Sequence, residues 1–309
     1  MAVKSPGPRH SSELVINWHL TEACNYGCRY CYSRWHGGNG KELLHDAENS
    51  QALLRELFDY FSPENLATQA QLGMRWNSVR LSLAGGEPLL YEREVVRLAT
   101  FARELGFNIS LISNGSRLND ALMSELAPLL SVLGLSLDSA DPEINRQIGR
   151  VDRKSQLVSL TKLAATVNEG RSRNPDMRLK INTVVNALNF TDNLSETIAL
   201  FNPDKWKVLR VLPALSNDLA IAKHEFAEFL ARHDRFAPII SAEDNSDMVE
   251  SYIMIDPHGR FFQNSSAGQG YRYSEAIPDV GAQAAFRQIS WIADKFQARY
   301  AVDRSACPA

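Results

Sequence analysis

Short apolar runs alternate with amphipathic stretches through the first two-thirds of the chain. The apolar runs are rich in Val, Ile and Leu and are typical of buried strands, whereas the stretches between them are typical of helices. The predicted strands are Leu14–Thr21, Val79–Ala84, Phe107–Ile112, Val132–Leu137, Arg178–Val185 and Lys205–Leu212. The predicted helices between them are Asp46–Tyr60, Glu92–Leu105, Asp120–Leu126, Gln156–Val167 and Asp192–Leu200.

This order of elements predicts an α/β fold. Repeated βα units form a parallel sheet with right-handed crossovers. Six units are too few to close an eight-stranded barrel, so we expect an open, partial (βα)6 barrel. Active sites in such barrels lie at the carboxyl ends of the strands. The site should therefore lie in the loops that follow the strands.

The pattern changes after about Ser216. A helix at Lys223–His233, a short strand at Tyr252–Asp256 and a last helix at Gln283–Tyr300 predict a C-terminal α+β extension. The predicted organisation is a flexible tail, the partial barrel and an extension that covers the barrel opening, at residues 1–13, 14–215 and 216–309.

Polar residues share one face on four of the predicted strands. Side chains alternate between the two faces of a strand. One face carries the following polar residues: Asn17 and His19; Ser136 and Asp138; Lys180 and Asn182; Lys205 and Lys207. Buried lysines are costly unless they are paired, so this face predicts a cationic lumen that binds an anion such as a polyphosphate. The alternative is that these lysines are solvated or pair with nearby carboxylates.

Composition and charge narrow the function classes. The 309 residues are 44% hydrophobic and 22% charged, with a net charge of −3, so no bulk basic field attracts nucleic acid or an anionic membrane. The N-terminus has no signal-peptide core, and no apolar run approaches the roughly 18 residues of a membrane span. Four cysteines, three of them clustered, indicate a reducing compartment. We expect a cytoplasmic protein with no membrane or nucleic-acid partner.

The three clustered cysteines are Cys24, Cys28 and Cys31, directly after the first predicted strand. A structural zinc site would complete its tetrahedron with a fourth local Cys or His. A [4Fe–4S] cluster held by three thiolates instead leaves one iron open for a small molecule. The C-x3-C-x2-C spacing is typical of radical S-adenosylmethionine (SAM) enzymes, so these cysteines are the predicted ligands of a [4Fe–4S] cluster that binds SAM.

Motifs at later strand ends supply candidate SAM contacts. The two glycines of S-L-A-G-G-E-P-L allow close approach to the backbone, whose carbonyls can accept from the methionine amino group of SAM. The segment I-S-N-G-S and a later serine are suited to bind the ribose and the carboxylate of SAM. An arginine at the end of I-N-R-Q-I-G-R can pair with the methionine carboxylate. Each motif alone is also typical of an ordinary turn or helix end. The predicted cofactor contacts are Tyr30, Gly85, Gly86, Glu87, Ser113, Asn114, Ser136 and Arg150.

The segment H-G-G-N-G-K after the cysteines is not a P-loop. That motif requires Gly where Trp35 stands and Ser or Thr where Glu42 stands. We interpret the segment as a loop near the site, from which Arg34 or Lys41 reaches a phosphate. The fourth cysteine, Cys307, has no partner in the sequence and is predicted not to be a ligand.

Taken together, the motifs resemble the viperin family of radical SAM enzymes. The resemblance runs from about Leu14 to beyond Tyr252 and includes N-W-H-L-T-E-A-C-N-Y-G-C-R-Y-C, L-A-G-G-E-P, L-K-I-N-T-V-V-N, N-P-D-K-W-K-V-L and S-Y-I-M-I-D. It implies a radical SAM partial barrel and the conversion of CTP, GTP or UTP to a 3′-deoxy-3′,4′-didehydro nucleotide, a chain terminator of viral polymerases. In that reaction a 5′-deoxyadenosyl radical takes hydrogen from C4′ of the ribose, and the 3′-hydroxyl leaves as water.

The resemblance also implies roles for individual residues. Tyr252 matches a suggested proton donor and, with Lys180, is predicted to be catalytic. The predicted substrate contacts are Asn17, His19, Arg34, Lys41, Lys180, Asn182, Lys205, Lys207 and Arg299. The N-terminal amphipathic helix of the animal members is not expected here, and the loop after Cys31 is longer than in those members, so base selectivity is left open.

We expect a monomer that needs a reductase or a flavodoxin- or ferredoxin-type electron donor. The sequence leaves two alternative functions. A radical SAM enzyme acting on a peptide or another small molecule should carry further C-terminal cysteines, and only Cys307 is present. A non-catalytic Fe–S or zinc module would need neither the G-G-E-P motif nor a cationic lumen.

Overall fold

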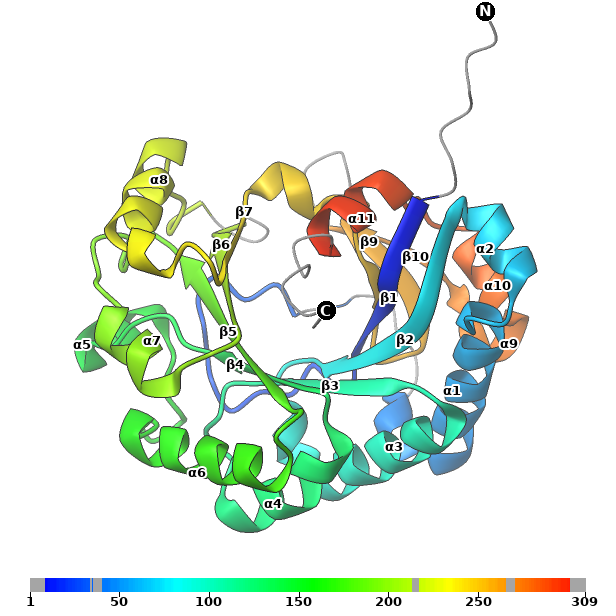
Figure 1. The fold of residues 1–309 in the computed structure, drawn as a ribbon, viewed down its shortest axis with the longest axis horizontal. Helices are drawn as coiled ribbons and strands as arrows, with labels where there is room; N and C mark the ends of the chain where they lie inside the picture. Colours follow the sequence, from blue (N-terminus) through cyan, green and yellow to red (C-terminus); the bar gives the residue numbers. More distant parts are fainter. Residues whose placement is uncertain (1–8, 34, 36–40, 213–216, 265–269, 301–309) are drawn as a thin grey trace, which may run out of the picture.

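The computed structural model describes residues 9–33, 35, 41–212, 217–264 and 270–300. Its strands form one ten-stranded sheet in the order β10-β9-β8-β1-β2-β3-β4-β5-β6-β7. Neighbouring strands are parallel from β8 to β7, and β9 and β10 are antiparallel additions at one edge. The sheet curves around a central opening with helices on its outside (Figure 1).

The strands are β1 (Arg9–His19), β2 (Met74–Ala84), β3 (Asn108–Ser113), β4 (Val132–Ser136), β5 (Arg178–Val185), β6 (Lys205–Arg210), β7 (Ile240–Glu243), β8 (Ile253–Ile255), β9 (Arg260–Asn264) and β10 (Tyr271–Ala276). The α-helices are α1 (Ala47–Phe61), α2 (Leu66–Leu72), α3 (Glu92–Leu105), α4 (Asp120–Leu126), α5 (Pro142–Ile148), α6 (Leu160–Arg173), α7 (Ser195–Phe201), α8 (Lys223–Arg232), α9 (Ile277–Val280), α10 (Ala282–Phe286) and α11 (Ala293–Tyr300). The 3₁₀ helices are η1 (Leu43–His45), η2 (Pro88–Tyr91), η3 (Ala127–Leu129), η4 (Asp234–Phe236) and η5 (Asn245–Met248).

The alternation of apolar and polar residues explains how the sheet and helices pack. On β1 the outward-facing Ile16 and Trp18 are fully buried, and on β6 Trp206 is too. These side chains belong to the main hydrophobic core, together with apolar residues of the surrounding helices. Local signals fix the helix ends: the Asp46 side chain accepts a hydrogen bond from Asn49 N at the start of α1. The partial barrel and its α/β class are confirmed.

Most predicted elements occur within a few residues of their predicted bounds, and β5, α3 and α4 match exactly. β1 begins at Arg9, inside the segment expected to be a tail, because residues 9–13 pair with β2. α6 begins later than predicted, after Ser159, whose side chain caps the helix by accepting from Lys162 N.

The prediction of one last helix over Gln283–Tyr300 is wrong. The structure has two helices there, α10 and α11, separated at residues 287–292. Ile292 N donates to Glu250 O at 2.9 Å. That hydrogen bond goes to a distant part of the chain rather than to the preceding turn, so a tertiary contact interrupts the helix.

The C-terminal third supplies both outer strands of the parallel part of the sheet. β7 pairs in parallel with β6 at one edge, and β8 pairs in parallel with β1 at the other. The parallel part therefore has eight strands instead of the predicted six. Of these elements, β7, β9 and β10 were not predicted, because each is short and lacks a long apolar run.

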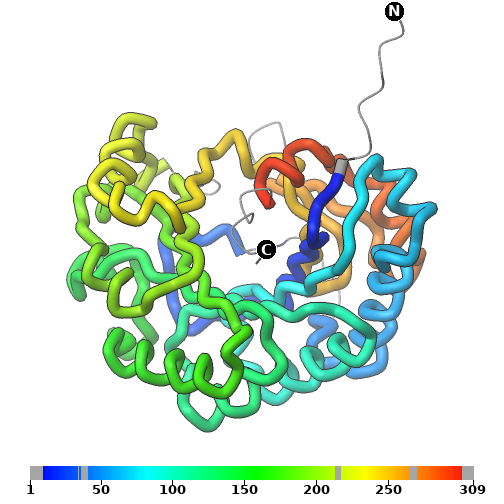
Figure 2. The backbone as a smooth tube through the Cα atoms, viewed as in Figure 1, coloured from blue at the N-terminus to red at the C-terminus, as the bar shows by residue number. Residues whose placement is uncertain are grey.

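The last described helix, α11, bridges the gap between the two edges of the parallel sheet. Figure 1 shows α11 between β7 and β1, and Figure 2 shows the same helix beside β1. On the β1 side Gln297 Nε2 donates to His10 O at 2.9 Å, and on the β7 side Arg299 Nη1 forms an ion pair with Glu243. Among the described residues no helix is long and apolar enough to cross a membrane.

Candidate functional site

A cavity of about 770 Å³ lies inside the curve of the sheet. Alternate residues of the strands line it, as the period of two requires. These lining residues are Val15, Asn17 and His19 of β1; Arg80, Ser82 and Ala84 of β2; Ser110 and Ile112 of β3; Lys180, Asn182 and Val184 of β5; and Lys205, Lys207 and Leu209 of β6. The prediction that polar residues and lysines face the lumen is confirmed, whereas for Lys207 the alternative also holds, because it pairs with Glu243 at 2.8 Å.

The cysteine-bearing loop after β1 is held by backbone hydrogen bonds from both sides. On one side Gly86 N donates to Thr21 O at 2.7 Å, and Glu87 N donates to Ala23 O at 2.8 Å. On the other side, Gly27 N donates to Gly149 O at 3.0 Å. The loop that carries the thiols is therefore fixed by the ends of β2 and α5.

Two glycines permit this close approach. A Cβ atom at Gly86 would lie 2.3 Å from Ala23 O, and one at Gly149 would lie 2.3 Å from Gly27 O. Gly149 also has a φ of 90°, a left-handed conformation that favours glycine. The glycines of G-G-E-P thus act partly by letting the cysteine loop pack against the strand end.

Gly86→Ala should displace the cysteine loop and reduce the iron content of anaerobically reconstituted protein by at least about half, because backbone atoms cannot yield as a flexible side chain can. Iron analysis and visible absorbance measure the effect. Gly27→Ala is the matched control in the same loop, since a Cβ there meets nothing within 4 Å. Equal iron content in the two variants would contradict this account.

The three thiols line the cavity and form no disulfide. Burial raises the pKa of Cys28 to about 12, so its thiolate needs positive charge beside it. No group of three or more His, Cys, Asp or Glu side chains in the described ranges converges on a single metal position. The three thiols on the cavity wall suit a [4Fe–4S] cluster with one open iron.

Glu87 organises the neighbouring loop. It is fully buried and does not line the cavity. Its carboxylate accepts from Ser113 Oγ at 2.8 Å and from Asn114 N at 2.7 Å. The structure therefore brings Gly85, Gly86, Ser113 and Asn114 to the cavity wall, whereas Glu87 lies behind them and holds the loop after β3 in place.

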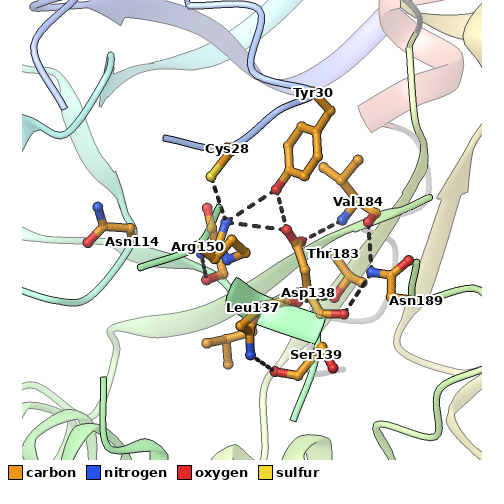
Figure 3. Close-up of polar contacts among 12 residues, drawn as sticks. Cys28, Tyr30, Asn114, Leu137, Asp138, Ser139, Arg150, Thr183, Val184 and Asn189 are labelled. Carbon is orange, nitrogen blue, oxygen red and sulfur yellow. Dashed lines mark hydrogen bonds and ion pairs between the residues drawn. The ribbon is translucent and has the colours of Figure 1, made fainter. Parts of the chain in front are cut away.

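An ion pair between Asp138 and Arg150 links the segment after β4 to the segment after α5, and Tyr30 and Cys28 of the cysteine loop lie beside it (Figure 3). Arg150 Nη1 lies 3.4 Å from Asp138 Oδ2, 3.3 Å from the Tyr30 hydroxyl and 4.0 Å from Cys28 Sγ. Tyr30 donates to Asp138, and Arg150 also donates to Ser136 O. The predicted contacts Tyr30, Ser136 and Arg150 are thus brought together beside Cys28.

Lysines gather on β5 and β6. The sheet register places Lys180 opposite Lys205 and Asn182 opposite Lys207, and all four residues line the cavity. Burial is the main cause of two lowered pKa values, with neighbouring cations adding to the effect: about 7 for Lys180 and about 8 for Lys207. This concentration of buried positive charge favours an anionic ligand.

Glu243, Tyr252 and Arg299 meet the end of Lys207. Lys207 Nζ lies 2.8 Å from Glu243 Oε1 and donates to the Tyr252 hydroxyl at 2.6 Å. Arg299 Nη1 forms an ion pair with Glu243 and donates to Tyr252. The predicted Lys207, Tyr252 and Arg299 are therefore brought together, around a carboxylate that the sequence did not single out.

The polar pair of β1 also lies on the cavity wall. Asn17 Nδ2 donates to Ile253 O at 3.3 Å. His19 is buried beside Trp35 and Phe262, with ring centroids 5.0 and 5.4 Å away, and burial lowers its pKa to about 3. His19 is therefore neutral and contributes no positive charge to the site.

The structure does not bring every predicted residue to the cavity. Lys41 is exposed and is not one of the lining residues, and Arg34 lies outside the described residues, as does Cys307. The sequence reasoning missed Asp138 and Glu243 as site residues. Asp138 could have been found from its place on the polar face of β4, whereas Glu243 carried no signal once β7 had been missed.

The radical SAM superfamily model matches residues 18–169. An S-adenosylmethionine-dependent nucleotide dehydratase of Pseudoalteromonas ulvae is 42% identical over 93% of each chain. A Danio rerio protein of the same name, with the suffix RSAD2, is 28% identical over 88% of this chain and 72% of its own.

A solved structure described as anSMEcpe with bound AdoMet has the same fold, with a TM-score of 0.65 and 13% identity over 92% of this chain and 84% of that one. Radical SAM enzymes use a [4Fe–4S] cluster and SAM, which suit the three thiols and the loops around them. The chain belongs to the radical SAM superfamily and, within it, to the family of S-adenosylmethionine-dependent nucleotide dehydratases.

Proposed function

We propose that this protein dehydrates a nucleoside triphosphate, CTP, UTP or GTP, to the 3′-deoxy-3′,4′-didehydro nucleotide. In this reaction C4′ of the ribose loses a hydrogen atom and the 3′-hydroxyl leaves as water, and the product serves antiviral defence as a chain terminator. One observation carries the proposal: the cavity that the cysteine loop lines also contains Lys180, Lys205 and Lys207. The proposed cofactor site and the proposed polyphosphate site would therefore share one cavity.

The cysteine loop and its supports would hold the cofactors. Cys24, Cys28 and Cys31 would bind the cluster. The backbone at Gly85 and Gly86 is open to the methionine amino group, and Ser113, Asn114, Ser136 and Arg150 lie around the same part of the wall. When bound, the cluster and SAM supply the one-electron chemistry that removes hydrogen from the substrate. The residues named here hold the reacting groups in position.

The lysines of β5 and β6 would bind the phosphates, and Asn182 would help to orient the nucleotide. Their charge is unusually costly to bury, as the lowered pKa values of Lys180 and Lys207 indicate, and phosphate oxygens offset that cost. Holding the triphosphate fixes the ribose between the lysines and the cysteine loop. Binding energy from the phosphates thus positions C4′ for the reaction.

Tyr252 is our proposed proton donor, with Lys180 as a second catalytic group. Burial and the neighbouring Glu243 raise the pKa of Tyr252 well above its ordinary value, so its phenol keeps a proton at neutral pH. A flavodoxin- or ferredoxin-type protein, or a reductase, would supply the electrons. We further propose that the enzyme acts in the cytoplasm as a monomer.

Anaerobically reconstituted protein with reductant and SAM should produce 5′-deoxyadenosine faster, by about ten-fold or more, when the correct nucleoside triphosphate is added, because a bound substrate consumes the cofactor productively. Separate assays with CTP, UTP, GTP and ATP, read by mass spectrometry, also identify the base. Nucleosides without phosphates are the control. If all four nucleotides leave the rate unchanged, the proposed substrate class is wrong.

A further inference from the structure

One carboxylate lies among the cations of the cavity. Glu243 ends β7 and its side chain is only 7% exposed. Three elements reach it: Lys207 of β6 at 2.8 Å, Tyr252 just before β8, whose hydroxyl donates at 2.8 Å, and Arg299 of α11. A single buried anion therefore joins β6, the segment before β8 and α11.

Without this anion the arrangement would be unfavourable. Lys207 Nζ lies 4.9 Å and the Arg299 guanidinium 3.7 Å from the centre of the Tyr252 ring, so two cations flank one phenol. Like charges this close repel strongly where water is excluded. Glu243 offsets the repulsion, and the two cations in turn hold the pKa of its carboxyl at about 2, so it is ionised at any pH of interest.

Glu243 also sets the direction of the Tyr252 hydroxyl. The phenol donates its proton to Glu243 Oε2 and accepts from Lys207 and Arg299. All of its ordinary hydrogen-bonding capacity is then used. The phenol is therefore fixed by its neighbours rather than free to rotate.

From these contacts we infer that Glu243 is a positioning residue, which orders Lys207, Arg299 and Tyr252 for the phosphates of the substrate. This role rests on the proposed function. Glu243 need not touch the nucleotide. It holds the cationic side chains in place before the substrate arrives. The free-energy cost of ordering these side chains is therefore met on folding and not on substrate binding.

Nucleotide binding should depend on pH through the charges of Lys180 and Lys207. Lys207 faces charged or titratable groups on every element around it, namely Lys180, Lys205, Glu243, Tyr252 and Arg299. Its pKa of about 8 means that it is a cation below that pH and loses its charge above it. Lys180, whose pKa is about 7, loses its charge before Lys207, so nucleotide binding should weaken as the pH rises from about 7 through 8. Removing the Glu243 charge should lower the pKa of Lys207 further and move this loss to a lower pH.

The test compares Glu243→Gln with wild type, using the SAM-loaded holoenzyme and the nucleoside triphosphate that stimulates it most. Calorimetry between about pH 6 and pH 9 should show binding weakened about ten-fold or more near pH 8, with the onset of weakening about one pH unit lower. SAM affinity should stay within about two-fold of wild type. Glu243→Asp, which keeps the charge, should restore most of the wild-type pH profile.

Glu169→Gln is the matched control, since it removes a carboxylate that forms a half-exposed ion pair with Arg173 on α6. It should behave as wild type. An unchanged nucleotide affinity and pH profile in Glu243→Gln would overturn the positioning role of Glu243 but not the proposed function. So would equal weakening of nucleotide and SAM binding, which indicates general damage. A wild-type protein that binds none of the four nucleoside triphosphates would overturn the proposed function itself.

Discussion

Cys28→Ala should abolish both the visible absorbance of the reconstituted cluster and the cleavage of SAM. Two thiols cannot replace three in holding a cluster for which three cysteines are the predicted ligands. Cys28 is also the thiol for which burial raises the pKa to about 12 and toward which Arg150 points a nitrogen at 4.0 Å. Absorbance and iron content measure the first loss, and 5′-deoxyadenosine production measures the second.

The control for this experiment is Cys307→Ala, because Cys307 is predicted not to be a ligand. Its iron content and SAM cleavage should equal those of wild type. Substantial SAM cleavage by Cys28→Ala would remove the cluster assignment, whatever the behaviour of the control.

Asp138→Ala should cause the largest loss of stability. Asp138 is only 1% exposed, and its side chain pairs with Arg150, accepts from Val184 N at 2.9 Å and accepts from Tyr30. Removing it leaves a buried guanidinium without its counter-charge, at a cost of about 3–5 kcal/mol in the free energy of unfolding. Thermal denaturation should show a decrease in Tm of about 5–8 °C.

A second substitution tests the reason for that loss. Arg150→Met in the Asp138→Ala background removes the unpaired charge, so the double variant should recover part of the lost Tm. The ion pair is not the cause if the double variant is less stable than Asp138→Ala. Both variants should also bind SAM poorly, because Arg150 lies beside the cysteine loop.

The sequence predicted the central part of the fold because that part depends on local patterns. Alternation along each strand is sufficient to place Asn17, Lys180 and Lys207 on one face, and parallel pairing then brings the faces together. The cysteine triplet and G-G-E-P were found because their chemistry is carried by adjacent residues. The residue pattern alone predicted only an anion such as a polyphosphate. The resemblance to viperin added the substrate class, a nucleoside triphosphate.

The sequence could not predict what depends on contacts between distant segments. β7 is four residues long, so it gives almost no periodic signal, and Glu243 at its end was missed with it. The break between α10 and α11 arises from the bond between Ile292 and Glu250. Arg150 was expected to meet the cofactor, but its partner Asp138 is known only once β4 and α5 are placed in space.

The position of the sheet's edges has a consequence for biosynthesis. β1 and β6 are covered by β8 and β7, which are made only in the last third of the chain. During translation the nascent barrel therefore presents two unpaired parallel edges and a cysteine loop with an open side. Unpaired edges are sites of aggregation. Cluster insertion should accordingly follow the synthesis of β7 and α11, which complete the barrel.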